Sequence, residues 1–215
     1  LNRVEIIESK LVFNDRKGGV VWRSPRTDLV MIREKSGLRA DAAISIAAQN
    51  RSSQVFAQLD FKRKAGVFVG RVRFEGLNPS LVSRSIDGLD DLANFSMPVA
   101  GEFAVKATRG GSIQIVAGTL NTPIGKVEGN FEFPSDGDAV SGLVRLEGLN
   151  VSEVAKRIPR MRKLAGVDLI FNGNIGGQGQ RDGWIKELEF NLVSGEGTVD
   201  VPVLWNGPRS IKEVR

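Results

Sequence analysis

The stretch Val72-Arg73-Phe74-Glu75-Gly76-Leu77-Asn78 returns 72 residues later as Val144-Arg145-Leu146-Glu147-Gly148-Leu149-Asn150. The register between the two copies extends well beyond this phrase: upstream, Val55 matches Val127. A long internal repeat is the signature of units that stack side by side and share one core. The sequence therefore predicts a modular chain.

The repeat divides the chain into three parts. Residues 1–54 are expected to form β-strands of a preceding or incomplete unit. Residues 55–126 form the first repeat unit and residues 127–215 the second, which we expect to be truncated at its C-terminal end. On this interpretation the chain is an internal segment of a longer protein.

Composition narrows the possible functions. The chain has 215 residues, of which 41% are hydrophobic, a size that suits one domain or a slice of an array. It contains no Cys, His or Tyr, which removes disulfides, thiolate chemistry and the commonest general base. We therefore expect no enzymatic activity, no metal and no cofactor. The 30 basic and 25 acidic residues are interspersed, which argues against nucleic acid as a partner.

Hydrophobic residues alternate with polar ones along most of the chain. In one example Val55, Leu59 and Phe61 alternate with Gln58 and Asp60 before a turn. About twelve such runs occur, and open twisted sheets rarely exceed about ten strands without curling or splitting. The sequence predicts a mostly β protein with a long antiparallel sheet, curled into an open trough or solenoid. A barrel and a sandwich are the alternatives, and the repeat disfavours a closed barrel.

One short helical excursion is expected in each repeat unit. Asn78 can cap a helix with Pro79 at its first position. Asn150 followed by Glu153 resembles a capping box, and Pro159 is expected to end that helix. A helix this short needs to dock its apolar side against the sheet.

The predicted sheet has one apolar face with two interpretations. It is either a dry core filled by side chains or an open groove that shelters acyl chains. Periodicity alone does not separate them. The residues predicted to form this face are Ile44, Ile46, Leu59, Phe61, Val72, Phe74, Phe131, Phe133, Val144, Leu146, Phe171 and Phe190.

A basic cluster follows the second copy of the phrase and also has two interpretations. It could meet phosphate head groups or a membrane surface. A solvated face is the other interpretation, because the matching stretch of the first unit contains Asp90 and Asp91. The cluster consists of Lys156, Arg157, Arg160, Arg162 and Lys163.

Two further motifs have simpler explanations. Gly176-Gly177-Gln178-Gly179-Gln180 lacks the ending of a phosphate-binding loop and is predicted to be a hairpin loop. The three tryptophans are expected to anchor packing, and a carbohydrate or protein binder would instead need them exposed. They are Trp22, Trp184 and Trp205.

Several of these motifs together resemble the AsmA-like superfamily, and its YhdP-like branch most of all, with TamB a more distant relative. The resemblance rests on Leu11-Val12-Phe13-Asn14-Asp15, on Trp22-Arg23-Ser24-Pro25 and on Phe74 to Pro79 before a short helix. Leu92-Ala93, Gly101, and Gly118-Thr119-Leu120 through Pro123 fit the same pattern.

The resemblance implies a function. Members are envelope proteins of Gram-negative bacteria, anchored in the inner membrane and projecting through the periplasm. They resemble bridge-like lipid transfer proteins, in which an apolar groove shelters phospholipid acyl chains on the way to the outer membrane. The partners implied are phospholipid and adjacent repeats of the same full-length chain, with membrane contact made by other regions. The alternative is a structural β-repeat scaffold with a solid core and no ligand.

Overall fold

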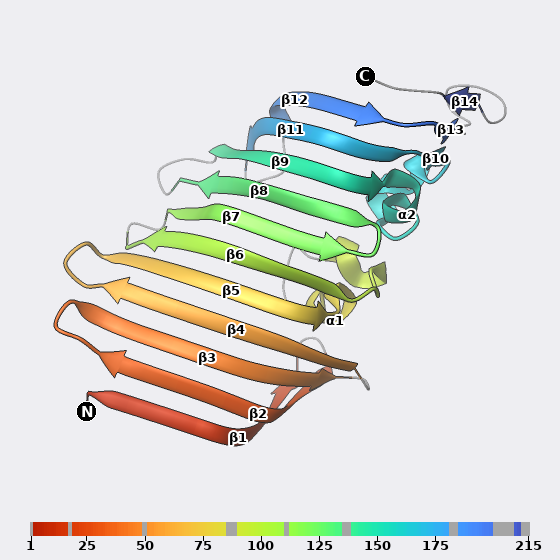
Figure 1. Ribbon diagram of the computed structural model, residues 1–215. Coiled ribbons are helices and arrows are strands. Elements are labelled where there is room, and N and C mark those ends of the chain that lie inside the picture. Colours follow the sequence, from red (N-terminus) through yellow and green to blue (C-terminus); the bar gives the residue numbers. More distant parts are fainter. Residues whose placement is uncertain are drawn as a thin grey trace.

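The computed structural model describes residues 2–16, 19–48, 51–84, 90–109, 112–134, 139–180, 185–199 and 209–211 (Figure 1). Most of these residues lie in strands. In chain order the elements are β1 (Arg3–Asp15), β2 (Val20–Arg33), β3 (Gly37–Ala48), β4 (Arg51–Lys62), β5 (Val67–Leu77), α1 (Pro79–Val82), η1 (Asp90–Asn94), β6 (Val99–Thr108), β7 (Ile113–Thr122), β8 (Gly125–Phe133), β9 (Ala139–Asn150), α2 (Val151–Ala155), η2 (Pro159–Leu164), β10 (Val167–Asp168), β11 (Ile170–Gln180), β12 (Ile185–Ser194), β13 (Gly197–Val199) and β14 (Arg209–Ile211).

Eleven strands form one antiparallel sheet in the order β1-β2-β3-β4-β5-β6-β7-β8-β9-β11-β12. The prediction of a mostly β, antiparallel fold is confirmed. The order is that of an open sheet with β1 and β12 at its two edges, as Figure 1 shows. A second sheet of three short strands, in the order β10-β13-β14, was not predicted.

The repeated phrase has the same backbone conformation in both copies. Gly76 and Gly148 lie in the left-handed region, with φ of 68° and 63°. Each marks a shift in strand register: the β5–β6 pairing skips between Phe74 and Leu77, and the β9–β11 pairing skips opposite Gly148. Glycine has no Cβ to oppose this geometry. The phrase therefore ends a strand in a bulge that redirects the chain into the helix.

Asparagine caps both helices as predicted. The Asn78 side chain accepts a hydrogen bond from the Ser80 N–H at 3.1 Å, and Asn150 accepts one from the Glu153 N–H at 3.0 Å. The reciprocal half of the expected capping box is absent, because the Asn150 N–H donates to the carbonyl of Ile124 instead. That carbonyl lies before β8, so the cap also joins the helix to the sheet.

Several local expectations were wrong. The helix α2 ends at Ala155, and Pro159 begins the following 3-10 helix, because a proline needs no N–H partner in a first helical turn. The sequence around Pro25 also suggests a break between two strands, but β2 runs through it with a register shift between Arg23 and Arg26. The stretch 176–180 is not a hairpin loop but the end of β11, where its glycines pair with β9 and β12.

The two units of the predicted repeat share an order of elements: two strands, two short helices, and then two long strands, with the two-residue β10 added before the long strands in the second unit. Figure 1 shows both helical excursions at the same end of the sheet. Buried hydrophobic side chains gather there. Phe95 from the excursion and Val99 cover Phe74, and Leu92 and Met97 pack beside them. The core is therefore small and local.

Candidate functional site

The strand register places all twelve predicted apolar-face residues on one face of the large sheet. Residues directly opposite each other in an antiparallel pair share a face, and alternate residues along each strand return to it. One row across the sheet shows this: Val55 pairs with Phe74, Phe74 with Gly101, and Gly101 with Leu120. We name this surface the apolar face and the opposite one the polar face.

Much of the apolar face is open to solvent. Only Phe74 and Leu146 of the twelve are buried, at 7% and 8% exposure, and Phe74 is covered by Phe95 and Val99 beside the first helical excursion. Phe190 is 66% exposed, and Leu59 and Phe131 are also exposed. The remaining seven are half-buried: Ile44, Ile46, Phe61, Val72, Phe133, Val144 and Phe171. No described element covers this part of the sheet as a second layer.

Charge is segregated between the two faces. Among the positions of β3 to β11 whose side chains the structure describes, none on the apolar face is Asp, Glu, Lys or Arg. The polar face carries ion pairs between and along the strands. Arg71 lies 3.2 Å from Glu102 across β5 and β6, and Lys126 lies 2.6 Å from Glu128. The carboxylate of Glu128 raises the pKa of Lys126.

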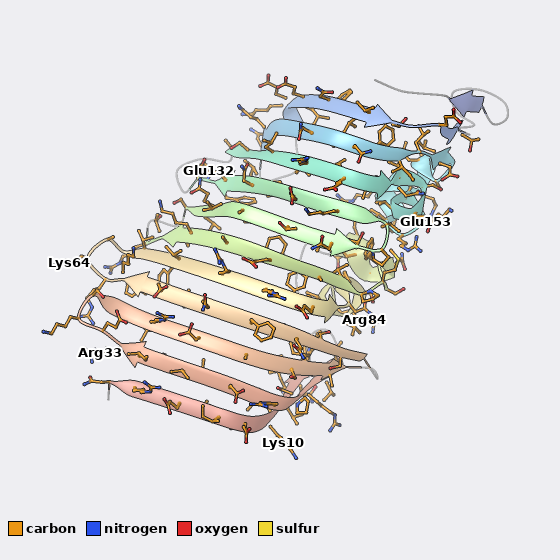
Figure 2. All side chains as sticks on the ribbon, in the orientation of Figure 1. Lys10, Arg33, Lys64, Arg84, Glu132 and Glu153 are labelled. Carbon is orange, nitrogen blue, oxygen red and sulfur yellow. The ribbon has the colours of Figure 1, made fainter. Side chains whose placement is uncertain are left out.

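These ion pairs are exposed and contribute little to stability. Their charged groups keep the polar face hydrated. Figure 2 shows that charged side chains also border the sheet, with Lys64 and Glu132 at the strand ends away from the helices and Glu153 at the helical end.

Phenylalanine rings on the apolar face lie over glycines of the next strand. A Cβ placed on Gly101 would come within 2.8 Å of the Phe74 ring, and one on Gly118 within 2.8 Å of the Phe103 ring. The ring of Phe131 lies in the same way over Gly142, at 2.5 Å. A ring that lies flat over a neighbouring strand does not project from the sheet, so the apolar face is comparatively flat at these positions.

The apolar face contains a hollow of about 420 Å³ over β8, β9, β11 and β12. A larger hollow, of about 620 Å³, lies on the polar face over nearly the same strands. Its walls are long polar side chains, including Gln114, Glu187 and Glu189. No group of three or more metal-ligating side chains that could hold an ion exists in the described part of the chain.

The basic cluster is divided by its ion pairs. Lys156 and Arg157 both bind Glu153, at 2.8 Å and 2.6 Å, and together lower the pKa of that carboxyl. Arg160 binds Asp91 of the first helical excursion at 3.0 Å. The opposite charges of the two excursions are therefore partly complementary. Arg162 and Lys163 are exposed.

Other predicted site residues are only partly placed. Trp22 is half-buried and packs against the buried pair Val20 and Leu81, as a packing anchor should. Trp184 and Trp205 lie outside the described residues. Sequence reasoning omitted further members of the apolar face, although they follow the same two-residue period: Phe103, Val105, Ile113, Ile115, Ile175 and Leu188.

Comparison with protein-family models found no match, and neither did comparison with curated proteins or with solved structures. No helix among the described residues is long and apolar enough to cross a bilayer.

Proposed function

We propose that this chain is a segment of a bridge-like lipid transport protein of the bacterial envelope, with the apolar face as the surface that shelters phospholipid acyl chains. The observation that carries the proposal is the apolar face itself: its described side chains from β3 to β11 carry no charge, and much of it is open to solvent. Exposed apolar surface of this extent marks a ligand or partner site in most proteins. A scaffold with a solid core would have that surface filled.

The dimensions of the face suit lipid tails. Nine strands from β3 to β12 give eight spacings of about 4.8 Å, or about 38 Å across the strands. One leaflet of a bilayer core is about 15 Å thick, so the face is longer than one tail. Each methylene group removed from water contributes about 0.8 kcal/mol. Tails would lie on the apolar face while head groups remain in water.

The finer architecture belongs to the same proposal. In it the sheet curls lengthwise into a trough, and neighbouring repeats of the longer chain continue the face at β1 and β12. The motifs that resemble the AsmA-like superfamily and its YhdP-like branch support a periplasmic location between an inner-membrane anchor and the outer membrane. The helical excursions would form one wall of the trough, because both lie at the same end of the sheet.

A matched pair of variants tests the proposal. Val105 lies on the apolar face and its neighbour Ala104 on the polar face of the same strand. A carboxylate that is placed among lipid tails loses its hydration, whereas one on the polar face does not. We expect phospholipid to copurify with the unmodified chain and with Ala104→Glu, and to be lost from Val105→Glu.

Lipid extraction followed by mass spectrometry gives the readout, and far-ultraviolet circular dichroism confirms that both variants fold. Absence of lipid from the unmodified chain, together with failure to take up fluorescent phospholipid from vesicles, would overturn the proposal. So would equal lipid binding by the two folded variants.

A further inference from the structure

The hollow on the apolar face owes its depth to missing side chains. Gly142 on β9 lies directly opposite Gly177 on β11, and Gly179 follows on the same face of β11. Gly177 leaves its backbone bare as the floor of the hollow, whereas the ring of Phe131 lies over Gly142. Neighbouring rows keep their side chains: Val144 and Ile175 stand on one side of the glycines.

The second wall and the two ends of the hollow are also apolar. Phe133 and Val140 stand on the side away from the helices. Phe131 occupies the β8 end, opposite Gly142, and Leu188 occupies the β12 end, opposite Gly177. The hollow therefore runs across the strands. The Phe131 ring, which lies over Gly142, and the bare backbone of Gly177 form its floor, and its walls are aliphatic and aromatic.

Its size matches one hydrocarbon chain. From β8 to β12 there are three strand spacings, or about 14 Å, close to the length of one lipid tail. The two walls are formed by residues four positions apart along each strand, such as Val144 and Val140 on β9. Their backbones are about 13 Å apart, and their side chains narrow this gap. A volume of about 420 Å³ lies within the range of ligand pockets.

We infer that this hollow is a seat for a single straight alkyl chain, lying across β8, β9, β11 and β12 over Gly177. This inference rests on the proposed function and adds a specific place and a shape preference to it. A straight chain fits between the two rows of side chains, whereas a chain with methyl branches would clash with Val144 and Ile175. We expect the rest of the apolar face to hold chains less selectively.

Because the chain has no cysteine, single cysteines can carry a polarity-sensitive fluorophore without background. Leu188 reports on the hollow, and Leu59 reports on the apolar face far from it, on β4. Leu143 faces the polar side and is 50% exposed, which matches the 53% exposure of Leu188. The three variants are Leu188→Cys, Leu59→Cys and Leu143→Cys.

The probes are palmitate, a straight chain, and phytanate, which has the same main-chain length with methyl branches. We expect palmitate to shift the emission at position 188 at the lowest concentration, to shift position 59 only at higher concentration, and to leave position 143 unchanged. Phytanate is expected to bind the hollow about tenfold more weakly than palmitate. This is the loss in affinity expected when about two methylene groups of the ligand stay exposed to water.

A filled hollow provides the second test. Ile175→Trp puts an indole into the hollow, and Asn174→Trp puts one on the polar face of the same strand as a control. Ile175→Trp should weaken the palmitate response at position 188 about tenfold and leave position 59 unchanged. The control should alter neither response.

The outcomes separate the two proposals. A palmitate response at position 59 that equals that at position 188, or an unchanged response in Ile175→Trp, would overturn the seat and leave the lipid-binding face intact. No response at either position would overturn both.

Discussion

At the residue scale, glycine decides how this sheet is built. Gly76 and Gly148 supply the left-handed conformation that ends a strand in each copy of the repeated phrase. Gly101 and Gly142 instead make room for a phenylalanine ring from the next strand. The repeated phrase and its glycines could be found in the sequence. The ring-over-glycine pairs could not, because they depend on which residues of different strands are opposite each other.

The left-handed glycine gives a prediction for stability. A Cβ on Gly148 would meet no atom within 4 Å, so the only cost of Gly148→Ala is its φ of 63°. We expect the free energy of unfolding to fall by about 1–2 kcal/mol. Gly195 is the control, since a Cβ there also meets nothing and its backbone is not left-handed.

Urea unfolding of Gly148→Ala, Gly148→Asn and Gly195→Ala measures the effect. Asn tolerates the left-handed region better than Ala, so it should recover part of the loss. Equal stabilities of the two alanine variants would show that the bulge conformation carries no strain.

At the element scale, the short helices could be located from the sequence but their hydrogen bonds could not. The capping residues Asn78 and Asn150 were correct because their side chains act within a few residues. The partner of Glu153 was wrong because Lys156 and Arg157 compete for its carboxylate and the Asn150 N–H finds a distant carbonyl. A local pattern does not reveal a partner as distant in the chain as the Ile124 carbonyl.

The helix α2 therefore gives a pH prediction. Lys156 and Arg157 lower the pKa of Glu153 in the folded chain below its ordinary value in the unfolded chain. Such a group stabilises the fold above its unfolded pKa, and this contribution is lost as the pH falls through the folded pKa. The stability difference between the unmodified chain and Glu153→Gln should be constant above about pH 5 and shrink on further acidification.

Urea midpoints measured from neutral to acidic pH follow this difference. Glu189→Gln is the comparison, because Glu189 has no ion pair with any other described residue. Parallel pH curves for the unmodified chain and Glu153→Gln would contradict the prediction.

At the scale of the whole molecule, the apolar face is buried at its helical end and exposed elsewhere. Alternation in the sequence predicted a one-sided sheet, and the strand register bears this out. Whether that side was covered could not be predicted, because a buried strand and an uncovered one have the same two-residue period. The answer depends on how much chain packs on top, and here only the helical end is covered.

Two phenylalanines on the apolar face should therefore behave differently. Phe74 is 7% exposed and packs against Phe95 and Val99, so Phe74→Ala should lower the free energy of unfolding by about 3–5 kcal/mol. Phe190 is 66% exposed, and Phe190→Ala should change stability by less than about 0.5 kcal/mol. Thermal and urea unfolding compare them. A large loss in Phe190→Ala would mean that this part of the face is covered in solution.

The strand order also has a consequence for folding kinetics. Each strand of the large sheet from β1 to β9 pairs with the strand that precedes or follows it in the chain, so most contacts join segments close in sequence. Folding rates rise as contacts become more local, and an array of neighbouring contacts can nucleate at any hairpin and spread both ways. We expect the growth of the sheet to slow at two links, from β5 to β6 and from β9 to β11. At each link a helical excursion must be closed as a loop before the next strand can pair.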